Sequence, residues 1–149
     1  MGLVKQVELR QLQSIRGGMA EFYTPQASHE TMLVQVPAGT IDDLFVHQAQ
    51  TDQLLVVRGR FVLVVLQNRQ YHYIPLSEKR PMVVRIPTGV PHAAINLSKD
   101  PCVLVNAVLR HAPPRERDYQ PLTPPFPYDL ITVAKVLRSL DSLDAAQIA

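Results

Sequence analysis

The sequence predicts an all-β domain of the antiparallel barrel or sandwich kind. Three observations favour this class. Short apolar runs recur at intervals of roughly ten residues, stretches containing glycine, proline or asparagine separate them, and only one segment shows convincing helical periodicity. The 149 residues are the length of one domain, and 46 % are hydrophobic while 19 % are charged, a composition typical of a folded globular chain.

The expected strands are the runs rich in Val, Ile, Leu, Phe and Tyr: residues 4–12, 19–23, 31–36, 54–57, 61–66, 82–86, 93–97 and 102–109. Residues 54–57 and 61–66 are predicted to form a hairpin around Arg58-Gly59-Arg60, where glycine permits a tight turn. Residues 63–66 are apolar without alternation. We therefore expect both faces of that strand to be covered, one by the barrel interior and the other by a second sheet or another subunit.

Residues 113–128 are rich in proline and are expected to form neither a helix nor a central strand. The segment Pro121-Leu122-Thr123-Pro124 fits the PxxP pattern of SH3 ligands. The interpretation we favour is an extended arm that wraps the barrel, anchored by Tyr119, Phe126 and Tyr128.

Asp129 is a good helix N-cap, and the spacing of the apolar residues after it predicts a helix to about Leu143. Its stripe of Leu130, Val133, Leu137 and Leu140 is expected to pack on the barrel or on a partner subunit. We divide the chain into a barrel (1–112), the arm (113–128) and a helix with its tail (129–149), all within one domain.

Composition excludes several classes of function. The net charge is +2 and the arginines are scattered, so nucleic-acid binding is not expected. The longest apolar run, 61–66, is far too short to span a membrane, and the N-terminus lacks the apolar core of a signal peptide. Cys102 is the only cysteine, so no intramolecular disulfide can form and a buried thiol is expected. The expected location is the cytoplasm.

The most specific segment is Ile86-Pro87-Thr88-Gly89-Val90-Pro91-His92-Ala93-Ala94-Ile95-Asn96. It resembles the second motif of the cupin superfamily, PxGxxHxxxN, at each fixed position. Pro87 ends a strand, Gly89 permits the turn, and His92 begins the returning strand with its ring able to enter the barrel. The resemblance implies a single-domain antiparallel cupin barrel, or jelly roll.

The first cupin motif resembles G-x5-H-x-H-x3-E-x6-G, and the sequence matches it only in part. Gly39 and His47 are present at a longer spacing, whereas Ala49 replaces the second histidine and Gln53 stands for the glutamate. Metal-binding cupins use these positions together with the motif-two histidine, which is His92 here. Loss of one imidazole and one carboxylate argues against a tight metal site.

Residues 39–116 also resemble a metal-free branch of the fold, the dTDP-4-dehydrorhamnose 3,5-epimerases, through the segment 86–92, Leu97-Ser98 and the strand from Val103 to Glu116. In that family a histidine at the position of His47 removes a proton beside the sugar ketone.

The other catalytic positions of that family differ here. Val105 stands where a proton-donating tyrosine is expected, Asp52 or Gln53 where a lysine is expected, and Leu44 replaces an arginine. Tyr71, Tyr73 or His111 are candidate substitutes for the missing acid.

Three functional hypotheses follow. The first is a sugar or nucleotide-sugar binding protein or epimerase-like isomerase with His47 as base, with Gln53, His92 and His111 contacting the substrate, and without a cofactor. The second is a metal-dependent oxygenase or isomerase whose divalent metal is held by His47, Gln53 and His92. The third is a ligand-binding cupin without chemistry. A homodimer is expected from the resemblance alone.

Overall fold

The computed structural model describes residues 6–17 and 20–148. The described strands and helices are β1 Glu8–Gln11, β2 Ser14–Gly17, β3 Ala20–Tyr23, β4 Glu30–Val36, β5 Gln50–Arg58, β6 Arg60–Gln67, β7 Gln70–Ser77, β8 Met82–Ile86, β9 His92–Ile95, β10 Cys102–Arg110, the 3₁₀-helix η1 Glu116–Tyr119 and the α-helix α1 Leu130–Ile148. Residues 4, 5 and 19, which belong to two of the expected strands, lie outside the described residues.

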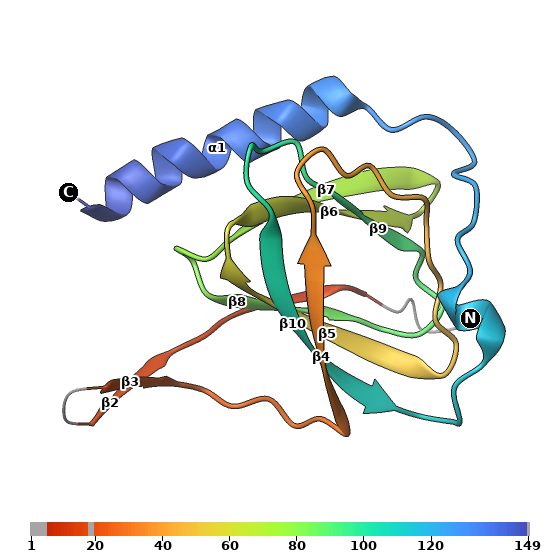
Figure 1. Cartoon of the computed structure of the whole chain (residues 1–149), viewed down its shortest axis with the longest axis horizontal. Coiled ribbons are helices and arrows are strands. Elements are labelled where there is room, and N and C mark those ends of the chain that lie inside the picture. The colour runs from red at the N-terminus through yellow and green to blue at the C-terminus, as the bar shows by residue number, and fades with distance from the viewer. Residues whose placement is uncertain (1–5, 18–19, 149) are drawn as a thin grey trace.

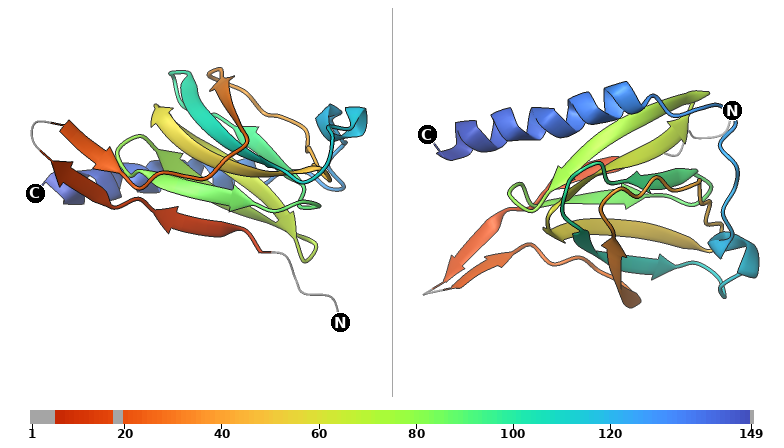
Figure 2. Two further views of the ribbon diagram at one scale, coloured as in Figure 1. Left: turned by 90° about the horizontal axis from the view of Figure 1, so that it is seen from below. Right: turned by 45° about the horizontal axis from the view of Figure 1, so that its top comes forward.

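Two antiparallel sheets form the barrel. The larger has the strand order β1-β8-β5-β10-β4 and the smaller β7-β6-β9, while β2 and β3 pair in a hairpin that projects from the barrel (Figures 1 and 2). Buried side chains from both sheets, including Leu54 and Leu104 of the larger and Phe61 and Leu63 of the smaller, form the main core. The chain therefore has the single-domain cupin fold that the second motif predicts.

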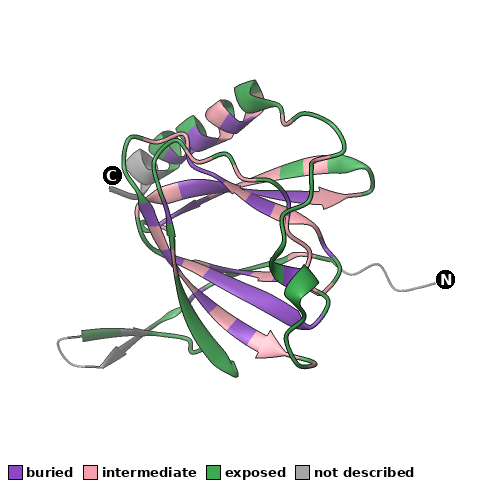
Figure 3. Ribbon diagram, turned by 45° about the vertical axis from the view of Figure 1, so that its right-hand side comes forward, coloured by how far each residue is buried: buried purple, intermediate pink, exposed green. Residues whose placement is uncertain are grey.

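The faces of β6 alternate between two cores. Phe61, Leu63 and Val65 point into the barrel, whereas Val62 and Val64 belong to a second core with Val133, Leu137 and Leu140 of α1. The prediction that both faces of this strand are covered is confirmed, but the outer cover is α1 (Figure 3). A helix replaces the expected second sheet or subunit because its apolar stripe fits this face.

Several strands differ from the sequence prediction, and β2 (Ser14–Gly17) is absent from the expected set. β5 begins at Gln50, four residues before the expected start. The sequence did not predict these four residues as strand because Gln50-Thr51-Asp52-Gln53 is polar and has little β propensity. β7 is also absent from the expected strands, and it contains Pro75. The structure accommodates this proline since β7 lies at the edge of its sheet, where a missing N–H donor can be tolerated.

The turn between β5 and β6 requires glycine. Gly59 has φ +81°, and a Cβ at this position would lie 2.7 Å from the carbonyl oxygen of Pro101. Any larger residue would combine left-handed strain with a backbone clash. The predicted turn therefore forms, but the predicted hairpin does not, because β5 pairs within the larger sheet and β6 within the smaller. The glycine marks the corner at which the chain passes from one sheet to the other.

Two hydrogen bonds join the arm to the barrel. Tyr128 donates a hydrogen bond to the carbonyl of Asp42 (2.9 Å), and Tyr71 donates one to the carbonyl of Phe126 (2.7 Å). The expectation that the arm holds no helix is wrong in one detail, because the 3₁₀-helix η1 forms in the stretch between Pro114 and Pro121. The absence of proline within that stretch permits it.

Asp129 caps α1, as expected. Its carboxylate accepts hydrogen bonds from the backbone N–H (3.1 Å) and the hydroxyl (2.6 Å) of Thr132. The helix continues beyond Leu143 to Ile148. Among the described residues, no helix is both long and apolar enough to cross a membrane.

Candidate functional site

Backbone pairing brings His47 and His92 together. Phe45 and His92 exchange hydrogen bonds at 2.8 and 3.0 Å, so the segment before β5 runs antiparallel to β9. The N–H of Gly89 donates to the carbonyl of His47 (2.9 Å) and fixes the next turn. As a result, the centroids of the two imidazole rings lie 5.2 Å apart. This is the convergence that the two cupin motifs predict.

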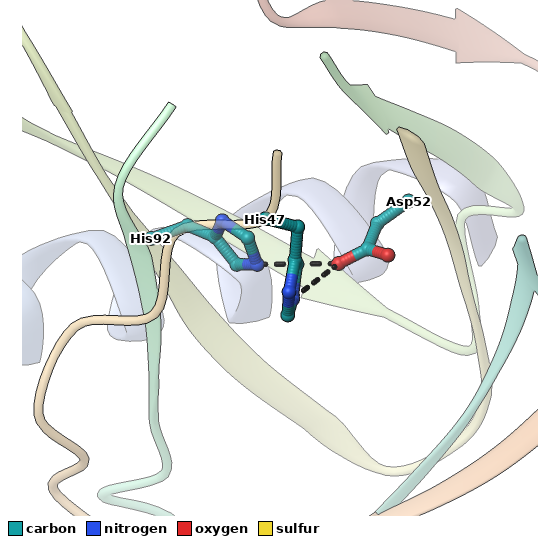
Figure 4. A group of neighbouring side chains, drawn as sticks. All are labelled: His47, Asp52 and His92. Atoms are coloured by element: carbon teal, nitrogen blue, oxygen red, sulfur yellow. Dashed lines mark ion pairs between the residues drawn. The ribbon is translucent and has the colours of Figure 1, made fainter. Parts of the chain in front are cut away.

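The alternation of β5 places a carboxylate between these rings. Gln50, Asp52 and Leu54 face the barrel cavity, whereas Thr51 and Gln53 face away from it. One oxygen of Asp52, Oδ2, lies 3.2 Å from Nε2 of His92 and 3.4 Å from Nε2 of His47 (Figure 4). The side chain of Asp52 is 5 % exposed and each imidazole 12 %. We call His47, Asp52 and His92 the cavity triad.

Asp52 stays ionised despite its burial. Burial alone raises its pKa, but the hydrogen bonds and charges of His47 and His92 outweigh that effect and hold the pKa well below the usual range of a carboxyl. The other oxygen, Oδ1, accepts a hydrogen bond of 2.6 Å from Nε2 of Gln50. Asp52 is therefore an oriented anion, with Oδ2 committed to the two rings.

The second nitrogens of the rings differ in their surroundings. Nδ1 of His92 lies 2.9 Å from the carbonyl of Val90, which accepts only, so Nδ1 carries a hydrogen. Nε2 of His92 then faces Asp52 either as the second N–H of an imidazolium or with a lone pair that needs a cation beside it. Nδ1 of His47, by contrast, is buried and has no hydrogen-bond partner among the described residues.

The cavity triad fits a divalent cation in its donor set. Its three ligand atoms lie within 4.8 Å of one another. The two distances from Asp52, 3.2 and 3.4 Å, match the separation of about 3.3 Å between ligand atoms at 2.0–2.1 Å from a tetrahedral zinc ion. The contact between His92 and Val90 also matches the backbone hydrogen bond that metal-bound histidines usually make through their other nitrogen.

The cavity around the triad has a volume of about 580 Å³. Its wall is mostly apolar, with Val34, Val36, Phe61, Leu63 and Leu104 among the lining residues. Such a volume with a few converging polar groups is typical of a small-molecule site.

Tyr119 of η1 also lines the cavity, and nothing in the sequence beyond its place in the arm indicates this. Its ring centroid lies 5.7 Å from that of His47, and its hydroxyl donates to Oε1 of Gln50 (2.9 Å). Asp118 positions it, because the buried carboxylate accepts hydrogen bonds from the N–H groups of Gln48 (3.0 Å) and Ala49 (2.9 Å). This contact ties η1 to the segment that carries His47.

Two residues expected in the site lie elsewhere. Gln53 points away from the cavity, and its amide donates to the carbonyls of Ala27 and Ala107 (both 2.9 Å). His111 is exposed at the end of β10, where Nε2 lies 2.7 Å from the hydroxyl of Thr51, on the outer side of β5. Both expectations fail for one reason. Gln53 and Thr51, the hydrogen-bond partner of His111, are odd-numbered residues of β5, and at this end of the strand such residues face outward.

A signal for Asp52 exists in the sequence. Counted back from Gly59, the spacing E-x6-G of the first cupin motif arrives at residue 52, whereas counting forward from His47 arrives at Gln53. The glycine is the better reference because its φ of +81° fixes the turn between β5 and β6. Tyr71 and Tyr73, considered as substitute acids, contact each other with ring centroids 6.2 Å apart, and they pack with the second core beneath α1.

Comparisons with solved structures support the fold. A dTDP sugar isomerase from Desulfovibrio desulfuricans G20 matches 87 % of this chain and 89 % of its own, with 18 % identity and a TM-score of 0.64. A mutant of the 3,4-ketoisomerase QdtA from Thermoanaerobacterium thermosaccharolyticum, solved with TDP-4-keto-6-deoxyglucose, matches 78 % of this chain and 87 % of its own at 14 % identity and a TM-score of 0.60.

An RmlC dTDP-6-deoxy-D-glucose-3,5-epimerase from Legionella pneumophila Philadelphia 1, solved with dTDP-4-keto-L-rhamnose, matches 71 % of this chain and 68 % of its own at 13 % identity and a TM-score of 0.59. No protein-family model matches the chain, and no curated protein matches it. At these identities the shared property is the RmlC-like cupin fold.

Proposed function

We propose that the chain is an epimerase- or isomerase-like enzyme that moves a proton on a small, sugar-like carbonyl compound bound in the barrel cavity. The observation that carries this proposal is the cavity triad, in which one buried carboxylate orients two imidazoles that face a largely apolar cavity of about 580 Å³. The RmlC-like fold, which the solved sugar epimerases and isomerases share, supports the same class of reaction.

In this proposal His47 is the base. With Nε2–H directed at Asp52, Nδ1 keeps an unshared lone pair, because no described residue donates to it. That nitrogen accepts the proton from the carbon beside the carbonyl, and the electron pair of the C–H bond moves into the enolate. Since Nδ1 is shielded, a change in ring orientation accompanies the transfer. Asp52 balances the imidazolium that forms.

The acid is Tyr119. The resemblance to epimerases leaves Val105 where a tyrosine is expected, and Val105 does not line the cavity. Tyr119 reaches the cavity from a different element, next to His47. Its phenol donates a proton to the enolate carbon and becomes a phenolate. His47 then releases the proton that it took to solvent, and the phenolate takes one up from solvent, which restores both side chains.

Solvent-deuterium exchange tests the proposal. The protein is incubated in D₂O with 4-keto sugars, both free and linked to dTDP, and loss of the C–H signals is followed by NMR. We expect exchange by the wild type and by His72→Asn, a control at an exposed histidine of β7. His47→Asn is expected to slow exchange by about 10²–10⁴-fold, the usual contribution of a general base. Absence of exchange with every ketone, or equal rates for His47→Asn, would contradict it.

A second candidate function is a metal-dependent isomerase or oxygenase. The observations that favour it are the tautomer of His92 and the spacing of the three ligand atoms. His47, Asp52 and His92 would hold the ion, with Asp52 replacing Gln53 in the ligand set predicted from the sequence. A bound divalent cation would supply Lewis-acid stabilisation of an enolate oxygen.

Elemental analysis of protein purified without an affinity tag tests this candidate. One equivalent of Fe, Mn, Ni or Zn per chain is expected, reduced at least tenfold in His92→Ala and unchanged in His72→Ala. Well under one equivalent in the wild type, with no uptake on reconstitution, argues decisively against it.

We also propose that the chain forms a homodimer through the outer face of the larger sheet. Leu33, Val105 and Leu55 are paired neighbours across three strands on the face opposite the cavity, and the next partner in the row, Val83, is already buried. Leu33 is 72 % exposed, an unusual state for an apolar side chain in such a row. Light scattering is expected to give twice the chain mass of 16.7 kDa for the wild type and a monomer for Leu33→Lys. A monomeric wild type contradicts the proposal.

A further inference from the structure

Among the residues that the structure describes, those that line the cavity include carboxylates but neither lysine nor arginine. The titratable groups facing the cavity are Asp42, His47, Asp52, His92 and Tyr119. The rest of the lining is apolar or neutral and includes the amides Gln35, Gln50 and Asn106. With neutral imidazoles the wall carries two formal negative charges, and two imidazolium ions would only cancel them.

Arg110 approaches this wall, but its guanidinium is already engaged. Its Nε and one terminal nitrogen donate to the two oxygens of Glu30, at 2.9 Å each. The other terminal nitrogen donates to Oε1 of Gln50 at 2.5 Å. The bidentate pair with Glu30 neutralises the charge, and Gln50 stands between the guanidinium and the cavity. A phosphate group would have to displace Glu30 to use this cation.

Backbone donors near the triad are engaged as well. The N–H groups of Gln48 and Ala49 lie at the segment that follows His47, and adjacent amides of this kind can bind anions. Here both donate to the carboxylate of Asp118. The protein's own carboxylate therefore occupies the position that a phosphate oxygen would need.

We infer that the cavity takes an uncharged carbonyl compound and excludes ligands whose phosphate groups enter it. The substrate class is then an unphosphorylated small molecule, unlike the nucleotide sugars in the solved neighbours. That the bound compound is also a substrate rests on the proposed function. The exclusion of phosphate rests only on the charges around the cavity.

Titration with dTDP tests the exclusion directly. The imidazole signals of His47 and His92 are followed by NMR while dTDP or thymidine, which differ only in the phosphates, is added. For the wild type we expect no saturable response to dTDP up to about 1 mM. Saturable binding of dTDP in the wild type would overturn the inference. That includes binding lost in Arg115→Ala or Arg117→Ala, because it would mean that exposed arginines of the arm hold the phosphates.

A charge variant shows whether electrostatics is the cause. Met32 lines the cavity from β4 and is 38 % exposed, so an arginine at this position can reach the cavity with its head group in water. Met32→Arg is expected to bind dTDP at least about tenfold more tightly than the wild type, a change of about 1.4 kcal/mol. Met32→Leu is the matched control and is expected to behave as the wild type. Equal dTDP binding by both variants would contradict the electrostatic explanation.

Proton exchange separates this inference from the proposed function. Exchange with unphosphorylated ketones alone supports both. Exchange with dTDP-linked sugars alone supports the proposed function and overturns the inference. If no ketone exchanges, the proposed function fails, and the dTDP titration still decides whether the cavity excludes phosphate.

Discussion

Substitution of Asp52 by Asn removes the charge at the centre of the cavity triad and nearly preserves the volume of the side chain. The carboxylate lies 3.2 Å from His92 and 3.4 Å from His47, and Gln50 donates to its other oxygen. Asn retains an acceptor for Gln50 but loses the attraction to an imidazolium. The variant therefore isolates the electrostatic contribution of Asp52 without creating a cavity.

The size of the effect follows from these distances. One pair of unit charges at 3.2 Å attracts by about 5 kcal/mol at an effective dielectric constant of about 20. Burial of the carboxylate offsets several kcal/mol of this attraction. A net loss of about 2 kcal/mol remains, which for a chain of this length lowers the melting temperature by about 4–8 °C.

The loss is expected to depend on pH with a definite sign. The pKa of Asp52 is lowered in the folded state, hence its contribution is present above the ordinary Asp value of about 3.9 and is lost as the pH falls below it.

Urea denaturation of wild type and Asp52→Asn at about pH 7 and about pH 3, on either side of the ordinary carboxyl pKa, measures this dependence. Because the contribution of Asp52 is lost as the pH falls, we expect the difference in unfolding free energy to be larger at the higher pH. An equal difference at both values, or a more stable variant, would refute the assignment of Asp52 as the counter-ion of the two rings.

Three further predictions concern residues that hold the site in place. Asp118→Ala leaves one buried and one partly buried N–H group without acceptors and is expected to lower the unfolding free energy by about 2–3 kcal/mol in urea, with part of the loss recovered in Asp118→Asn. Gly59→Ala is expected to cost at least about 2 kcal/mol, from left-handed strain and the contact with Pro101, whereas Gly39→Ala has similar strain but open space and is expected to cost about 1 kcal/mol; equal losses would contradict the clash. Burial raises the pKa of Cys102 to about 11, so the thiol is expected to react with a disulfide reagent at about pH 8 only after unfolding, and rapid labelling of the folded protein would contradict this.

The sequence predicts the barrel well because its apolar runs and turn residues agree at each level. The segment 86–96 predicts the β8–β9 turn and the entry of His92 into the cavity, and Gly89 has the positive φ that this turn requires. The turn at Gly59 and the cap at Asp129 form as expected. These are local features, and their chemistry is readable from a few adjacent residues. Whether the strands beside Gly59 pair with each other is a tertiary property, and there the local interpretation as a hairpin was wrong.

The cavity triad was predictable only in part. His47 and His92 follow from the motifs, but Asp52 lies in a polar stretch that no propensity assigns to a strand. Whether the side chain of residue 52 or of residue 53 faces the cavity depends on where β5 begins. An error of one residue in that position therefore predicts Gln53 in the site instead of Asp52. Tyr119 was beyond sequence reasoning, because its place depends on a tertiary contact between Asp118 and two backbone amides that lie 70 and 69 positions away.

The central claim is that His47 and His92 share one buried carboxylate inside the cavity. Imidazole ¹⁵N NMR of the wild type and of Asp52→Asn tests it most directly. We predict that the signals of His47 and His92 change together in the variant, that Nδ1 of His92 stays protonated in both proteins, and that His29 and His72 are unaffected. Independent behaviour of His47 and His92, or no response of either ring, would contradict the account.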